Sequence, residues 1–113
     1  MVVDYEKMNA VVSDYVRDVA DVFRVSRAVL YGSYAKGTAN KYSDVDICFF
    51  IDDELDTERR IEVLTKLLGL TYKYCSLDTL YIEPNVFPTS SIENGNPFVN
   101  ELLATGREIQ IGA

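Results

Sequence analysis

Residues 30–50, LYGSYAKGTANKYSDVDICFF, constrain the fold of this chain more than any other stretch. The stretch begins inside a short apolar run, residues 28–31, that is rich in strand formers. Gly32 then lets the backbone turn sharply. We expect a brief helical turn next, with Ser33 as its N-cap and Gly37 at its end. The free N–H groups at the start of such a turn attract anions. This half of the stretch is therefore predicted to hold phosphate.

The other half predicts a second strand, residues 44–51, that begins with two carboxylates. Asp44 and Asp46 alternate with Val45 and Ile47, so both acidic side chains project from one face of the strand. At roughly 3.3 Å per residue they lie about 6–7 Å apart along the chain, near enough to converge on one hard cation. Two unpaired carboxylates would repel each other. Their pairing therefore predicts a Mg²⁺ ion or a phosphate-bound metal at this site.

Each feature taken singly has an ordinary structural explanation. A Gly-Ser pair after a strand is usually only a turn, and Asp-x-Asp is usually a solvated strand face. The spacing of Gly32 and Gly37 also matches the phosphate loop G-x-x-x-x-G-K-[ST], but Lys36 precedes Gly37 and Thr38 stands where that loop requires lysine. The stretch is therefore not a phosphate loop of that class, and its meaning depends on the order of all its parts.

Taken together, GSYAKG at 32–37 and SDVDI at 43–47 resemble the pattern G-S-x-A-[RK]-G…S-D-x-D-[LIV] of the DNA polymerase β-like nucleotidyltransferases. Short members of that superfamily are called minimal nucleotidyltransferases. The resemblance implies an α/β fold in which helices flank a mixed sheet, like the palm of polymerase β. It also implies two Mg²⁺ ions and transfer of a nucleoside monophosphate, AMP from ATP, to a hydroxyl group with loss of pyrophosphate.

The motif positions assign expected roles to single residues. The resemblance implies that Asp44 and Asp46 bind metal and that four residues contact the nucleotide: Gly32, Ser33, Lys36 and Ser43. An exposed lysine such as Lys36 is equally often a solubilising residue.

Family members carry a third carboxylate on a neighbouring strand, and Asp78 and Glu83 are the two candidates. We expect Glu83 to fill this role as ligand and proton acceptor, because it lies in the strand-like alternation of residues 79–83. Asp78 stands where that strand would begin and is expected to be a turn residue. Pro84 is expected to end the strand.

Composition limits the remaining possibilities. With 113 residues, 48% hydrophobic and 26% charged, the chain is expected to form one domain, residues 1–113. A net charge of −7 is the opposite of the basic surface that holds long nucleic acid. Without histidine, carboxylates are the expected proton acceptors, and Cys48 and Cys75 lack the spacing of a zinc site or disulfide framework. No leader sequence or membrane-spanning run is recognised, so a cytoplasmic location is expected.

The rest of the chain reads as packing elements. An apolar stripe predicts an amphipathic helix over 4–23. The acidic run 52–56 reads as a loop whose Asp56 caps a helix over 57–68 that ends at Gly69. The residues expected to face inward from this helix are Ile61, Leu64, Leu67 and Leu68.

Towards the C-terminus the pattern is less regular. Residues 70–76 are ambiguous but favour extended structure, and 86–95 read as a turn-rich loop. Asn96 and Pro97 are expected to start a helix that ends at 105–106. Residues 108–111 read either as a last short strand or as an extended tail.

The acceptor hydroxyl is expected to come from outside this chain, because 113 residues leave no space for an acceptor-binding domain. The resemblance implies a separate helical HEPN-type protein, with this chain as the antitoxin that adenylylates a tyrosine of the toxin. Two alternatives remain open: a non-catalytic module that neutralises its partner by contact, and a drug-modifying nucleotidyltransferase. A homo-oligomer and a hetero-oligomer are both compatible with the sequence.

Overall fold

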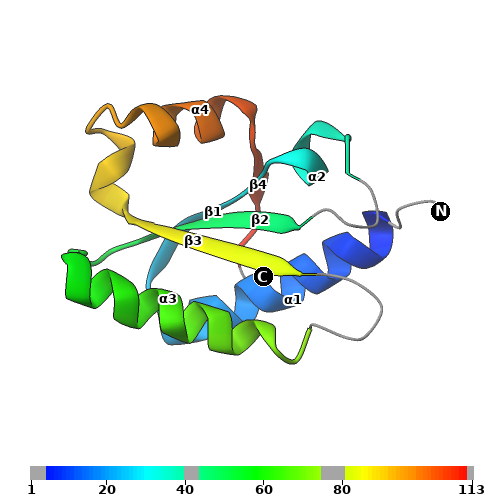
Figure 1. Ribbon diagram of the computed structural model, residues 1–113, viewed down its shortest axis with the longest axis horizontal. Helices are drawn as coiled ribbons and strands as arrows, with labels where there is room; N and C mark the ends of the chain where they lie inside the picture. Colours follow the sequence, from blue (N-terminus) through cyan, green and yellow to red (C-terminus); the bar gives the residue numbers. More distant parts are fainter. Residues whose placement is uncertain (1–4, 40–43, 75–80, 112–113) are drawn as a thin grey trace.

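The computed structural model describes residues 5–39, 44–74 and 81–111, and these form helices packed on both faces of a four-stranded sheet (Figure 1). In chain order the elements are α1 Tyr5–Val22, β1 Val25–Tyr31, α2 Ser33–Lys36, β2 Val45–Ile51, α3 Thr57–Thr71, β3 Ile82–Pro88, the 3-10 turn η1 Thr89–Ile92, α4 Pro97–Thr105 and β4 Arg107–Ile109.

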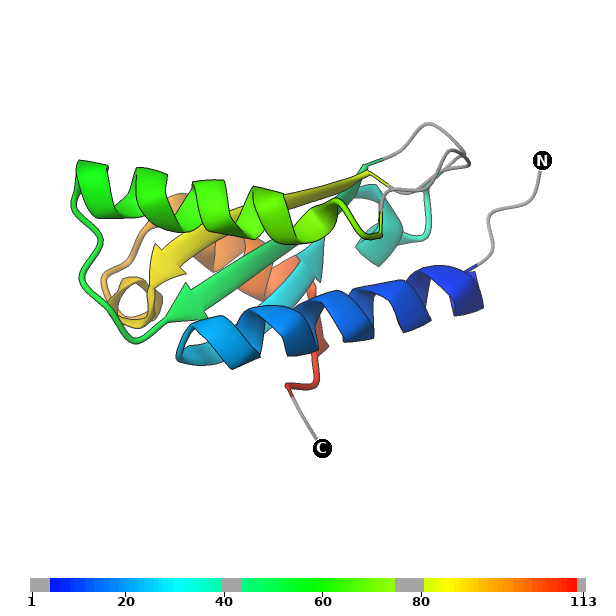
Figure 2. The ribbon, with the colours of Figure 1, turned by 90° about the horizontal axis from the view of Figure 1, so that it is seen from below.

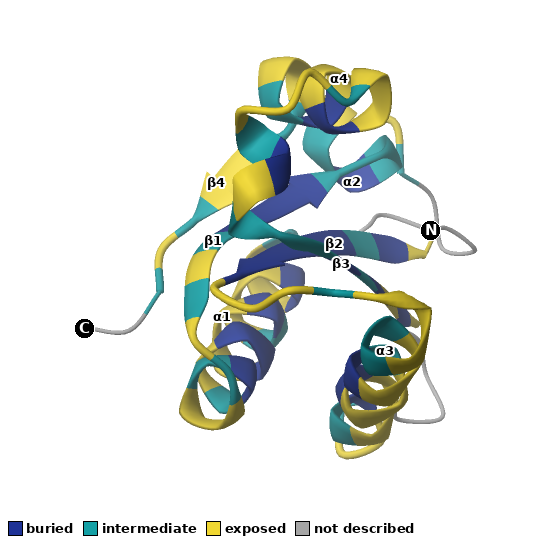
Figure 3. Ribbon diagram, turned by 90° about the vertical axis from the view of Figure 1, so that its left-hand side faces the viewer, coloured by how far each residue is buried: buried dark blue, intermediate teal, exposed yellow. Residues whose placement is uncertain are grey.

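The strand order is β3-β2-β1-β4. β1 pairs antiparallel with both β2 and β4, whereas β2 and β3 are parallel, with α3 in the connection between them. The expected mixed sheet flanked by helices is thereby confirmed. Helices α1 and α3 cover one face and α4 covers the other, as Figure 3 shows in side view.

Strict alternation along β2 divides the core into two layers. Val45, Ile47, Phe49 and Ile51 are buried against α1 and α3. Cys48 and Phe50 are buried on the opposite face, together with Val29 of β1 and with Val99 and Leu102 of α4. Because side chains alternate along a strand, Asp46 lies on the α4 face of the sheet.

Helix α1 confirms the predicted amphipathic helix and lies on the same face of the sheet as α3, the face turned to the viewer in Figure 2. The buried Tyr15 hydroxyl donates to the Leu67 carbonyl oxygen over 2.8 Å. Asp18 forms an ion pair with Lys73 at 2.9 Å and accepts a hydrogen bond from Tyr74, so α1 is joined to the end of α3 by polar contacts as well as by core packing. No helix in the described part of the chain has the length and apolarity needed to cross a membrane.

Helix α3 corrects two expectations. Asp56 does cap the helix, accepting from the Arg59 N–H at 2.8 Å, but the helix continues through Gly69 to Thr71. Ile61 and Leu68 do not face inward, since they are 59% and 50% exposed. The buried positions are Val63, Leu67 and Thr71, because the helix rests on the margin of the sheet and turns the Ile61 side to solvent.

Strand β3 was also placed wrongly from the sequence. It spans Ile82–Pro88, so Pro84 lies within the strand and 86–88 are not a loop. All seven residues pair with β2, and β3 is an edge strand, where proline is tolerated because no second neighbour needs its N–H.

The predictions for the segments before and after β3 are partly confirmed. The expectation of extended structure is wrong for Leu70 to Tyr74, which form the end of α3 and a turn. Asp78 and Cys75 lie outside the described residues, as do 79 and 80 of the predicted strand. Asn96 caps α4 with Pro97 at its start, as expected, and the open question at 108–111 resolves into the short strand β4 over 107–109.

Candidate active site

The turn after β1 is built on two glycines in left-handed conformations. Gly32 has φ +74° and caps α2, and Gly37, with φ +73°, ends it. The N-cap is thus Gly32 and not Ser33, which is the first helical residue; the reason is that only glycine adopts this φ without strain. Among the described residues, no hydrogen-bonding partner is found for the Ser33 hydroxyl, and Lys36 is exposed and forms no ion pair.

The carboxylates lie where β2 runs between its two neighbours. Asp46 is the register partner of Glu83 on β3 and of Tyr31 on β1. Burial, followed by the charges of Glu83 and Asp44, raises the pKa of Asp46 to about 6. The structure therefore brings Glu83 and Asp44 close enough to Asp46 for their charges to act on it.

The glycine turn and the carboxylates form one site, because Asp46 packs directly against Gly32. A Cβ atom placed on Gly32 would overlap Asp46 Oδ2. No side chain larger than hydrogen fits at this position while Asp46 keeps its orientation. A group bound at the turn would therefore be adjacent to the Asp46 carboxylate.

This donor set suits a hard cation, since carboxylate oxygens are the ligands that Mg²⁺ prefers. The raised pKa of Asp46 reflects its burial first and then the charges of Glu83 and Asp44, which a divalent ion would offset. Within residues 5–39, 44–74 and 81–111, however, no three acidic, thiol or imidazole side chains lie close enough together to form a complete metal-binding site. Ser43 lies outside the described residues, and its expected contact with the nucleotide stays a prediction.

Comparison with protein families decides what kind of domain this is. The family model described as "Nucleotidyltransferase domain" matches residues 12–99, which include β1, β2, β3 and the glycine turn. The chain belongs to this nucleotidyltransferase family. The recognition made from the glycine turn and the Asp-x-Asp strand is confirmed.

Solved structures share the fold of this nucleotidyltransferase domain at low sequence identity. A Sulfolobus solfataricus protein assigned as a nucleotidyltransferase is 15% identical with a TM-score of 0.58, covering 92% of this chain and 80% of that one. A toxin–antitoxin structure with AMP-PNP is 19% identical with a TM-score of 0.55, covering 92% and 73%. A mutant MntA-HpeT toxin–antitoxin structure is 16% identical with a TM-score of 0.50, covering 97% and 75%. No curated protein sequence matches significantly.

Several residues beside the nucleotidyltransferase carboxylates were missed from the sequence. Burial and the nearby Asp46 charge raise the pKa of Tyr31 to about 12, and the neighbouring Asn85 side chain partly offsets this rise. Arg60 of α3 donates to Asn85 Oδ1 over 2.7 Å. The two-residue step from Glu83 to Asn85 could have indicated a shared face, but the approach of Arg60 depends on how α3 packs on the sheet.

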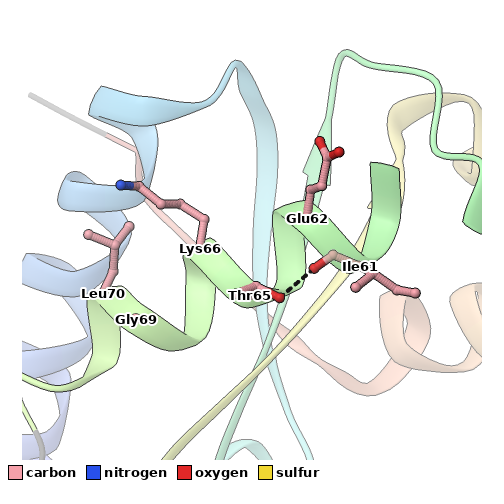
Figure 4. Close-up of a pocket in the computed structure, with 6 residues that line it drawn as sticks. All are labelled: Ile61, Glu62, Thr65, Lys66, Gly69 and Leu70. Atoms are coloured by element: carbon pink, nitrogen blue, oxygen red, sulfur yellow. Dashed lines mark hydrogen bonds between the residues drawn. The ribbon is translucent and has the colours of Figure 1, made fainter. Parts of the chain in front are cut away.

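A hollow on the surface of α3 lies away from the carboxylates. It has a volume of about 650 Å³ and follows the outer side of α3, where Figure 4 shows Thr65 Oγ1 donating to the Ile61 carbonyl oxygen over 2.8 Å. Its lining residues are Ile61, Glu62, Thr65, Lys66, Gly69 and Leu70. These come from α3 alone and provide no converging carboxylates, so the hollow is not the nucleotidyltransferase site.

Proposed function

We propose that this nucleotidyltransferase transfers AMP from ATP to a hydroxyl group in a Mg²⁺-dependent reaction, with Asp44, Asp46 and Glu83 as the metal-binding carboxylates. The observation that supports this most directly is the packing of Gly32 against Asp46, with Glu83 opposite on β3. A turn that could hold phosphate therefore lies beside carboxylates that could hold Mg²⁺, an arrangement that suits nucleotidyl transfer.

In this proposal the N–H groups of Gly32 and Ser33, together with the Ser33 hydroxyl, hold the triphosphate. Lys36 lies at the end of α2 and offsets phosphate charge. Asp46, held between two neighbouring strands, fixes the position of the α-phosphorus relative to this turn.

The reaction balances as a single displacement. The acceptor oxygen forms a bond to the α-phosphorus, the bond from that phosphorus to the bridging oxygen breaks, and pyrophosphate leaves. Glu83 accepts the hydroxyl proton. Two Mg²⁺ ions, when bound, would supply charge neutralisation for the leaving pyrophosphate and a lowered pKa for the attacking hydroxyl.

The test is transfer of label from α-labelled ATP in the presence of Mg²⁺. Asp44→Asn and Asp46→Asn should each abolish transfer while the fold, followed by circular dichroism, is kept. Glu101→Gln is the matched control, because it removes one charge from an exposed position on α4. Full activity in both aspartate variants would exclude the metal-binding role.

We further propose that the acceptor is a tyrosine on a separate helical HEPN-type protein, which this chain neutralises as an antitoxin. Two observations support the proposal: two of the structures with this fold are toxin–antitoxin assemblies, and a net charge of −7 suits a basic, RNA-cleaving partner.

Incubation of native lysate with labelled ATP and Mg²⁺ should label one protein, which a pull-down with this chain also recovers. Asp44→Asn should still bind that protein but neither modify it nor protect cells. Full protection by Asp44→Asn would instead identify a contact-only antitoxin. Labelling of a free small molecule with no recovered partner would identify a drug-modifying enzyme.

A further inference from the structure

Three aromatic side chains meet on the α4 face of the sheet, and we call Tyr31, Phe87 and Phe98 the aromatic ledge. The Tyr31 and Phe98 rings meet edge to face with centroids 5.8 Å apart, and Phe87 and Phe98 are 5.7 Å apart. Phe98 is 44% exposed even though its helix is already anchored by the buried Val99 and Leu102. The exposed part of the Phe98 ring is therefore not needed to fill the core.

The ledge begins beside the carboxylates. Tyr31 and Asp46 are register partners, and Phe87 follows Glu83 on the same face of β3 at two-residue steps through Asn85. From Asp46 the ledge extends along the strands towards the carboxyl ends of β2 and β3. Helix α2 lies beyond the other end of these strands, after β1 (Figure 1). The Phe87 end of the ledge thus lies on the far side of the carboxylates from the glycine turn, and Tyr31, which directly precedes Gly32, lies level with Asp46.

The Phe87 side of the ledge is held in place by contacts with Arg60 of α3. The Arg60 guanidinium lies over the Phe87 ring at 5.5 Å and donates to the Val86 carbonyl oxygen at 3.2 Å and to Asn85 Oδ1 at 2.7 Å. Asn85 Oδ1 also accepts from the Val86 N–H at 2.9 Å. A surface fixed in this way loses little side-chain entropy when a ring binds to it.

In-line displacement decides which group reaches this surface. The leaving pyrophosphate and the attacking oxygen lie on opposite sides of the α-phosphorus, so a turn that holds the pyrophosphate leaves the far side of the carboxylates for the acceptor. We infer that the aromatic ledge is the acceptor-binding surface and that Phe98 selects acceptors whose hydroxyl is carried on an aromatic ring. This inference rests on the proposed nucleotidyl transfer.

The kinetic test uses N-acetyl-tyrosinamide as the acceptor and N-acetyl-serinamide as its aliphatic counterpart, with labelled ATP and Mg²⁺. The wild type should prefer the tyrosine amide. Phe98→Ala should raise the KM for that amide about 3- to 10-fold, the size expected for one lost aromatic contact, and leave the KM for ATP unchanged. Phe98→Tyr should keep the wild-type KM because it keeps the ring, and Leu68→Ala, exposed on α3, is the matched apolar control.

A binding measurement keeps the test independent of turnover. With AMP-PNP and Mg²⁺ present, the Phe98 ring resonances should shift on titration with N-acetyl-tyrosinamide, and those of Leu68 should not. Absence of a shift at Phe98 would overturn the inference, and so would a raised KM for ATP in Phe98→Ala, which would make the ledge a base-binding surface. If Asp44→Asn loses transfer while Phe98→Ala keeps the wild-type KM for the acceptor, only the assignment of the aromatic ledge as the acceptor-binding surface is contradicted. If Asp44→Asn retains transfer, the proposed function is contradicted as well.

Discussion

The Asp46 carboxyl group joins the two halves of the site. Gly32 packs against it, and strand register sets Tyr31 on one side and Glu83 on the other. Burial and two neighbouring carboxylates all oppose its ionisation. Substitutions around Asp46 therefore act through its position or its charge, and these two effects can be measured separately.

We expect Asp46→Asn to gain stability relative to the wild type as the pH rises from about 4 to about 6. The pKa of Asp46 is about 6 in the folded protein against 3.8 as its ordinary value, so in this window the folded state holds a proton that the unfolded chain has released. The stabilisation is complete below the unfolded value and is lost as the pH passes the folded one. Solvent screening reduces the difference to about 1 kcal/mol.

Urea unfolding of both proteins at several pH values, without Mg²⁺, measures this difference. Parallel pH curves for wild type and variant would mean that the Asp46 carboxyl ionises normally.

Gly32 and Gly37 together test the position of Asp46. Alanine at Gly37, which is in the left-handed helical region, costs about 1–2 kcal/mol of backbone strain; at Gly32, whose φ of 74° and ψ of −153° only glycine adopts readily, it costs more. Only at Gly32 does the added Cβ overlap the Asp46 carboxylate, since nothing lies within 4 Å at Gly37. Gly32→Ala should therefore lose about 10- to 100-fold in transfer rate per folded molecule, and Gly37→Ala should keep most of its activity on the same basis. Equal losses in both variants would show that Asp46 tolerates the displacement.

At the scale of single elements, α3 gives a test of helix continuity. Gly69 is an exposed interior residue of this helix, and a Cβ there would meet no atom within 4 Å. Gly69→Ala should therefore stabilise the protein by about 0.5–1 kcal/mol in urea unfolding. Gly106→Ala should destabilise it, because its Cβ would overlap the Leu102 carbonyl oxygen. A destabilised Gly69→Ala protein would mean that the helix does end at Gly69.

What the sequence predicted depends on how local each signal is. The start of α4 and the caps at Asp56 and Asn96 follow from residues within one turn of each other, and they were predicted correctly. The length of β3 was not, because Pro84 is tolerated only where the strand lies at a sheet edge.

The same distinction holds for the site. Gly32, Asp44 and Asp46 were identified as candidates because they share one stretch of chain. Glu83 was preferred from strand alternation, and the structure places it opposite Asp46. The contact of Arg60 with Asn85 depends on the packing of α3, which no local pattern in the sequence carries.

For the whole molecule, the net charge of −7 and the carboxylate cluster have a common consequence. Negative charge concentrated around Asp46 disfavours binding of a free nucleotide, which is itself an anion. Mg²⁺ reverses this by lowering the charge of both the site and the triphosphate. Nucleotide binding should therefore require Mg²⁺. The thermal stability of the protein should show whether the nucleotide is bound.

We expect AMP-PNP with Mg²⁺ to raise the Tm, whereas AMP-PNP with EDTA should leave it unchanged. A ligand at 100 times its Kd adds about 2.7 kcal/mol to the stability of the folded state, which corresponds to a rise of about 10 °C for a domain of this size. Asp44→Asn should abolish the shift, and Glu101→Gln, which removes the same charge from exposed α4, should keep it. An equal shift with EDTA would mean that the glycine turn binds nucleotide without metal, and the carboxylates would then act only after binding.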